Sequence, residues 1–98
     1  MSVGRTSEIH KATEEVQHLA EEIRGDLEAK TGRHFPEFKA IEYMTQLVSG
    51  INYFVRIQVD DNDYIHVRIF KPLPHTGNKP EVSNYQTSKT KDDSLTYF

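Results

Sequence analysis

The chain has 98 residues, a length that fits one compact domain and leaves no room for a second. Charged residues make up 28% of the chain and the formal net charge is −3, which argues against nucleic acid or an anionic membrane as the main partner. Cysteine is absent, which excludes disulfides and thiolate metal sites, and with no apolar signal core we expect one cytosolic domain over residues 1–98.

One amphipathic helix is predicted in the first third of the chain. Thr13 is suited to cap its start, and Gly32 is suited to close its end in a left-handed conformation. Gly25 lies inside this span and should weaken the helix by about 1 kcal/mol relative to alanine. Five residues with three- and four-residue spacing form the apolar stripe: Val16, Leu19, Ala20, Ile23 and Leu27.

Beyond Pro36 the apolar residues recur with a period of two, which predicts three strands and a weaker fourth around residues 82–87. The intervening polar positions, which include Arg56, His66 and Arg68, are expected on a solvated outer face. The residues expected to alternate with them are Ile41, Tyr43, Thr45 and Leu47 in the first strand, Tyr53, Val55, Ile57 and Val59 in the second, and Ile65, Val67 and Ile69 in the third.

The simplest architecture is an α+β domain in which an antiparallel meander packs its apolar face on the single helix. Alternate loops of a meander lie at the same end of the sheet. The turn at Ser49-Gly50 and the loop over residues 72–80 should therefore share one end, and the acidic turn over residues 60–63 should lie at the other.

The two loops at the shared end are unusually apolar. Leu47 and Val48 precede the first turn, and Leu73 stands between two prolines in the second loop. Apolar groups exposed together on rigid loops are typical of a binding surface. The alternative is that Leu47 and Val48 complete a strand face while Leu73 folds inward, and the residues alone leave both possibilities open.

The chain resembles the cystatins, and within them the disulfide-free stefins. Residues 46–50 (Gln-Leu-Val-Ser-Gly) match the Q-x-V-x-G first hairpin of that family. The resemblance extends over essentially the whole chain and includes Gly4, Asn52-Tyr53-Phe54, Leu73-Pro74 and the ending Leu95-Thr96-Tyr97-Phe98. It implies the cystatin fold, in which an antiparallel sheet wraps around one long helix.

The resemblance also implies a function, namely reversible, tight-binding and competitive inhibition of papain-like cysteine proteases such as cathepsins B, H, L and S. In cystatins the N-terminal segment and two hairpin loops form an apolar wedge that enters the active-site cleft. No cofactor or metal is implied. The residues expected to bind the protease are Val3 and Gly4 in the N-terminal segment, Gln46, Leu47, Val48, Ser49 and Gly50 in the first loop, and Leu73, Pro74 and His75 in the second.

Other interpretations are weaker but remain open. The chain could be a protein-binding module of the same fold that does not inhibit proteases. An enzyme is not expected, because the sequence contains no recognised catalytic or phosphate-binding motif. We expect an active monomer. Straightening the first hairpin would fuse two strands and exchange halves between chains, and we expect the resulting domain-swapped dimer to be inactive.

Overall fold

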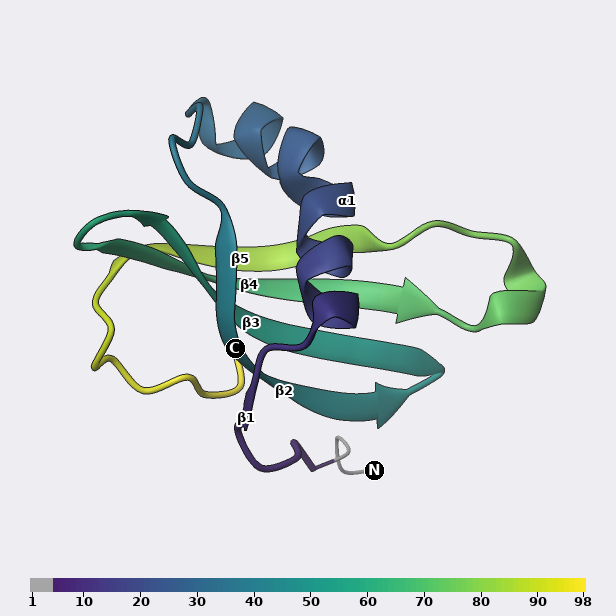
Figure 1. The fold of residues 1–98 in the computed structure, drawn as a ribbon. Coiled ribbons are helices and arrows are strands. Elements are labelled where there is room, and N and C mark those ends of the chain that lie inside the picture. The colour runs from purple at the N-terminus through teal and green to yellow at the C-terminus, as the bar shows by residue number, and fades with distance from the viewer. Residues whose placement is uncertain (1–4) are drawn as a thin grey trace.

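The computed structural model describes residues 5–98 as one five-stranded antiparallel sheet with a single long helix packed on one face (Figure 1). The strands follow one another in chain order, so the predicted α+β meander is confirmed. No helix in this part of the chain is long and apolar enough to cross a membrane. The elements are β1 (His10–Lys11), α1 (Glu14–Thr31), β2 (Lys39–Val48), β3 (Gly50–Asp60), β4 (Asp63–Pro72), the short 3₁₀ helix η1 (Pro74–Thr76) and β5 (Glu81–Lys89).

Helix α1 begins and ends at the predicted residues. The Thr13 hydroxyl accepts a hydrogen bond from the Val16 N–H at 3.3 Å, which satisfies one of the free amides of the first turn. Gly32 has a φ of 69°, and its N–H donates to the Glu28 carbonyl at 2.9 Å. All five residues of the predicted apolar stripe are buried against the sheet.

The strand register places the two apolar loops at one end of the sheet, as predicted. Val48 is the cross-strand partner of Gly50, so Ser49 alone forms the tip of the β2–β3 hairpin. Gly50 in turn is opposite Pro72, where β4 ends and the β4–β5 loop begins. The acidic turn between β3 and β4 lies at the other end (Figure 1).

The prediction of a solvated outer face is wrong. Phe54 and His66 are fully buried, and Arg56 is 5% exposed. The cause is the tail after β5, which turns back toward β2 (yellow in Figure 1) and adds Leu95 to a second apolar cluster with Met44 and Phe54. The rings of Tyr97 and Phe98 also lie 5.7 and 5.6 Å from that of Phe54. Both faces of the sheet are therefore covered.

The buried guanidinium of Arg56 holds this tail in place. Its NH1 nitrogen donates to the carbonyl of Lys91 at 2.7 Å and to Oε1 of Glu42 at 2.5 Å, and its NH2 nitrogen donates to the carbonyl of Asp93. Its Nε donates to Nε2 of His66 at 3.3 Å. Burial and the neighbouring Arg56 charge lower the pKa of His66 to about 4, so this imidazole is neutral at pH 7.

Candidate functional site

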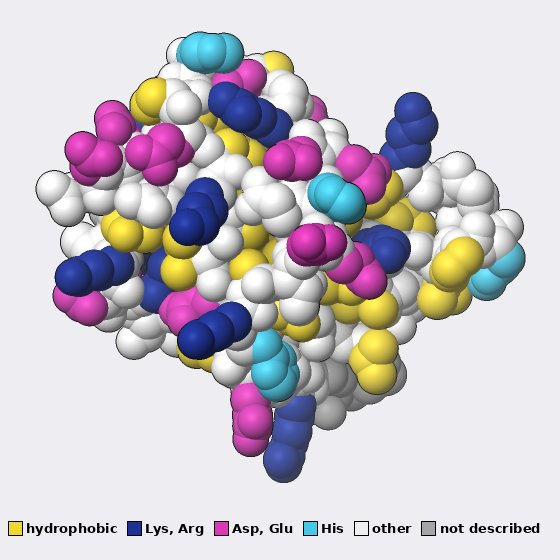
Figure 2. Space-filling view, viewed as in Figure 1, with side chains coloured by type: hydrophobic (Ala, Val, Ile, Leu, Met, Phe, Trp, Pro, Cys, Tyr) yellow, Lys and Arg dark blue, Asp and Glu magenta, His cyan; other side chains and the backbone are white. Residues whose placement is uncertain are grey.

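Three large apolar side chains are exposed at the end of the sheet where the first hairpin and the β4–β5 loop meet. Leu47 is 75% exposed, Val48 42% and Leu73 41%. We call these three residues the apolar edge. Figure 2 shows hydrophobic side chains, in yellow, exposed at this right-hand end of the molecule. The alternative in which Leu73 folds inward is excluded, because its side chain is exposed together with those of Leu47 and Val48.

The first hairpin is shaped by Gly50, which is buried rather than exposed. Its φ of 138° is rarely adopted by residues with a side chain. A Cβ at this position would lie 2.7 Å from the Lys71 carbonyl oxygen and 2.9 Å from the Phe70 ring. Glycine is required here because the hairpin packs its main chain directly against β4, which holds Val48 at the edge.

Gln46 lies next to the apolar edge, but its side chain is buried and only 2% exposed. Its Oε1 accepts a hydrogen bond from Nδ2 of Asn52 at 3.0 Å, across the β2–β3 pair. Thr6 forms a β-bridge with the same residue. Gln46 therefore joins the N-terminal segment, β2 and β3. The sequence alone did not predict this role for Asn52. It could have been found by pairing residues outward from the turn at Ser49, which places Asn52 opposite Gln46.

The N-terminal segment runs along β2 toward the apolar edge. The Ser7 N–H donates to the Thr45 carbonyl at 2.7 Å, and the Ser7 hydroxyl accepts from the Thr45 N–H at 2.9 Å. Arg5 and Leu47 consequently line the same shallow depression of about 310 Å³. Val3 and Gly4, the N-terminal residues of the predicted site, lie outside the described residues.

The second loop is held by local hydrogen bonds after Leu73. The Thr76 N–H and hydroxyl both donate to the Leu73 carbonyl, at 3.1 and 2.8 Å. Gly77 then reverses the chain with a φ of 71°. Pro74 and His75 are exposed in the intervening 3₁₀ turn. Because this backbone is fixed, little conformational entropy remains to be lost when Leu73 contacts a partner.

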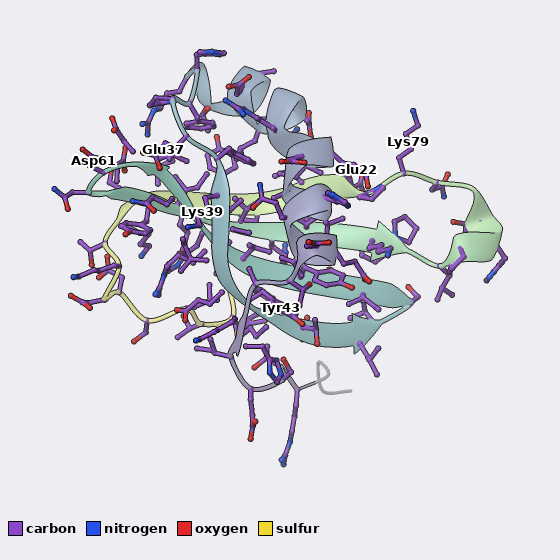
Figure 3. All side chains as sticks on the ribbon, viewed as in Figure 1. Glu22, Glu37, Lys39, Tyr43, Asp61 and Lys79 are labelled. Carbon is purple, nitrogen blue, oxygen red and sulfur yellow. The ribbon has the colours of Figure 1, made fainter. Side chains whose placement is uncertain are left out.

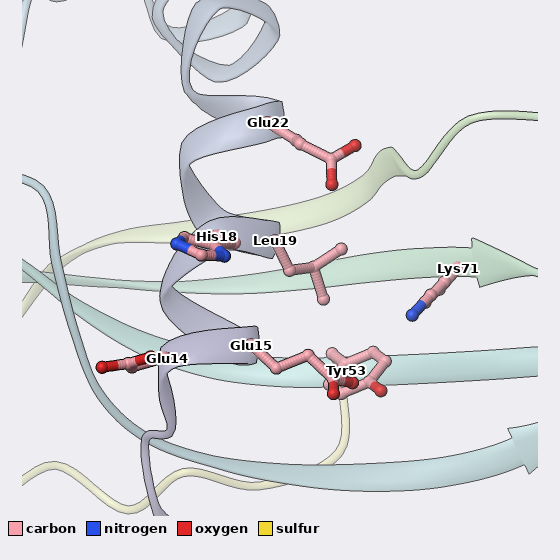
Figure 4. A pocket seen from close by; sticks show the side chains of 7 residues that line it. All are labelled: Glu14, Glu15, His18, Leu19, Glu22, Tyr53 and Lys71. Carbon is pink, nitrogen blue, oxygen red and sulfur yellow. The ribbon is translucent and has the colours of Figure 1, made fainter.

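A separate groove of about 300 Å³ lies between the first half of α1 and strands β3 and β4 (Figure 4). Carboxylates from the helix stand along one side, and Tyr53 and Lys71 lie opposite. Burial raises the pKa of Tyr53, and the nearby charge of Glu15 raises it further. The helix residues that line the groove are Glu14, Glu15, His18, Leu19 and Glu22.

No cation site is formed at the apolar edge by the residues that the structure describes. Within residues 5–98, the acidic side chains close enough together to share an ion are those of Glu37, Asp60 and Asp61, near the opposite end of the sheet, where Figure 3 labels Glu37 and Asp61. His75 lies two residues after Leu73, and its side chain is exposed to solvent. The edge therefore offers rigid apolar contact area and a main-chain turn.

Comparison with known proteins identifies relatives over the whole chain. A family profile described as the Cystatin domain matches residues 4–92. The chain is 46% identical to human Cystatin-B, 45% identical to Cystatin-B of Bos taurus and 48% identical to Cystatin-A of Felis catus. Each of these alignments spans 98 residues and covers 100% of both proteins.

Proposed function

The chain belongs to the cystatin family, and from this premise we propose that it is a reversible, tight-binding competitive inhibitor of papain-like cysteine proteases. The apolar edge would enter the active-site cleft and block substrate. The observation that carries this proposal is the joint exposure of Leu47, Val48 and Leu73 on two loops held side by side. We expect proteases of the cathepsin B, H, L and S type as partners, and action in the cytosol.

Rigidity of the two loops favours tight binding. Removal of a leucine side chain from water stabilises a complex by about 1.5–3 kcal/mol, provided that ordering the side chain and its loop does not offset the gain. Gly50 packs against β4 and Leu73 belongs to a hydrogen-bonded turn, so the backbone is ordered before the partner arrives. Binding of this kind involves no covalent bond, which makes the inhibition reversible.

The predicted site residues divide into two groups in this proposal. Those contact residues that the structure describes are exposed, whereas Gln46 and Gly50 are buried and would act by holding the first hairpin in shape. Val3 and Gly4 would extend the N-terminal segment past the apolar edge into the non-primed subsites of the protease. The proposed contact residues are Val3, Gly4, Leu47, Val48, Ser49, Leu73, Pro74 and His75.

The test is a titration of active papain with the purified monomer, with hydrolysis of a fluorogenic substrate as the signal. We expect stoichiometric, reversible inhibition. The double variant Leu47→Ala/Leu73→Ala should raise the inhibition constant at least about tenfold, because two contact side chains are truncated. Deletion of residues 1–4 should also weaken inhibition.

Ile9→Ala is the matched control, because Ile9 is 49% exposed but lies outside the apolar edge. It should inhibit like the parent protein. If the folded parent protein fails to inhibit at concentrations far above that of the enzyme, the proposal is wrong. The protein would then be a binding module that uses the same fold for another partner.

A further inference from the structure

Acidic residues are excluded from the two segments that build the apolar edge. Residues 43–59 and 64–80 contain no Asp or Glu, although the chain has 15 of them and a net charge of −3. The carboxylates are instead in α1, in the acidic turn, in the C-terminal tail and in the segments that flank these regions. Carboxylates are therefore absent from the two segments that form the apolar edge, although the protein as a whole is negative.

Two cations flank the apolar edge, and neither takes part in an ion pair among the described residues. Arg5 is exposed and lines the depression that contains Leu47. Lys79 is exposed in the β4–β5 loop, and Figure 3 shows its side chain extending away from the ribbon. The Lys and Arg side chains that form ion pairs among the described residues are Arg24, Lys30, Arg33 and Arg56; Lys39 and Lys91 form none either, so Arg5 and Lys79 differ from them by position.

Two further charged side chains, Lys71 and Glu81, lie near this end of the sheet. Lys71 turns toward the groove beside Tyr53, where Glu15 also lies (Figure 4), so its charge is partly offset. Glu81 at the start of β5 lines a shallow depression together with Val48 and Arg68, so this carboxylate lies beside the apolar edge and a cation lies in the same depression. With Arg5 and Lys79 exposed and Arg68 in the same depression as Glu81, cations outnumber carboxylates around the apolar edge.

This inference rests on the proposed inhibitory function and names the partner more closely. We propose that Arg5 and Lys79 steer the apolar edge toward proteases whose active-site cleft is bordered by carboxylates. Exposed charges around a binding surface accelerate encounter with an oppositely charged partner and contribute little once the complex has formed. Selection among targets would therefore operate through the association rate constant, and salt would weaken it.

The experiment measures association and dissociation rate constants by stopped flow, at low and at high salt. The target is a papain-like protease with Asp and Glu around its cleft, together with a variant of it in which these residues are replaced by Asn and Gln. The inhibitor variant is Arg5→Glu/Lys79→Glu. The control is Lys39→Glu/Lys91→Glu, which makes the same change in net charge at exposed lysines outside the apolar edge; Figure 3 shows Lys39 on the far half of β2.

At low salt the Arg5→Glu/Lys79→Glu variant should associate with the acidic protease about tenfold more slowly, with a dissociation rate within about twofold of the parent. The control should change association much less. The difference should shrink at high salt and with the neutralised protease. Equal association rates at low salt, or a loss that appears in dissociation, would overturn the inference while inhibition itself persists. Absence of inhibition by the parent protein would instead refute the proposed function.

Discussion

The side-chain amide of Asn52 donates a 3.0 Å hydrogen bond to the buried Oε1 of Gln46, across the base of the first hairpin. Thr6 bridges to Gln46 from the other side, so three segments that lead to the apolar edge share this residue. The relationship explains how a residue that is not exposed can support the shape of the proposed binding surface.

The first prediction concerns Asn52→Ala. The variant deprives a buried amide oxygen of a donor, which typically costs about 1–2 kcal/mol. We expect the free energy of unfolding in urea to fall by this amount and protease inhibition to weaken with it, because the hairpin and the N-terminal segment lose a common support. Asn62→Ala, in the turn at the opposite end of the sheet, is the control and should leave inhibition unchanged. Unaltered unfolding of Asn52→Ala would contradict the support role.

Glycine-to-alanine substitutions should have opposite effects at two positions. Gly50→Ala forces a Cβ to within 2.7 Å of the Lys71 carbonyl at a φ of 138°, so both stability and inhibition should decrease. Gly25→Ala introduces a Cβ with nothing within 4 Å in the middle of α1 and should stabilise the protein by about 1 kcal/mol. Thermal unfolding and papain titration of both variants test this pair. A Gly50→Ala protein that inhibits like the parent would show that the close approach to β4 is unimportant.

The buried His66 should make stability depend on pH. Its pKa is lowered from 6.5 to about 4 in the folded protein, so between these values the unfolded chain binds more protons. Stability therefore falls as the pH decreases from 6.5 to 4, by at most about 3 kcal/mol. The charged groups around the imidazole are Arg56 on β3, Lys89 on β5 and Asp93 in the tail.

Urea unfolding at several pH values between 7 and 4 tests this effect, with His66→Gln as the comparison. The variant should show a flatter profile, because glutamine does not titrate. The carboxylates with lowered pKa, Glu28 and Asp93, have ordinary values of 4.5 and 3.8, so their loss of stabilisation begins only at the acid end of this range. Parallel profiles for the two proteins would refute the assignment to His66.

A domain-swapped dimer, if it can be isolated, should not inhibit. Straightening the turn at Ser49 would fuse β2 and β3 into one strand, and the tip that carries Val48 would disappear. Monomer and dimer from one preparation can be separated by size-exclusion chromatography and titrated against papain. Full inhibition by the dimer would show that the hairpin tip is dispensable.

The sequence by itself determined the helix, its two ends, the antiparallel meander and the shared end of the two apolar loops. These features depend on local information. The spacing of apolar residues specifies α1, Thr13 and Gly32 act within one turn of their positions, and short connections leave neighbouring strands few other arrangements.

Only the tertiary structure decided which polar side chains of the sheet are buried. Alternation along β3 and β4 assigned Arg56 and His66 to solvent, yet both are buried because the tail returns from residue 90 and satisfies the guanidinium with its carbonyls. Gln46 points inward for a similar reason, since Asn52 and the N-terminal segment surround it. A polar side chain is buried when partners distant in sequence satisfy its hydrogen bonds, and no local pattern records where such partners will lie.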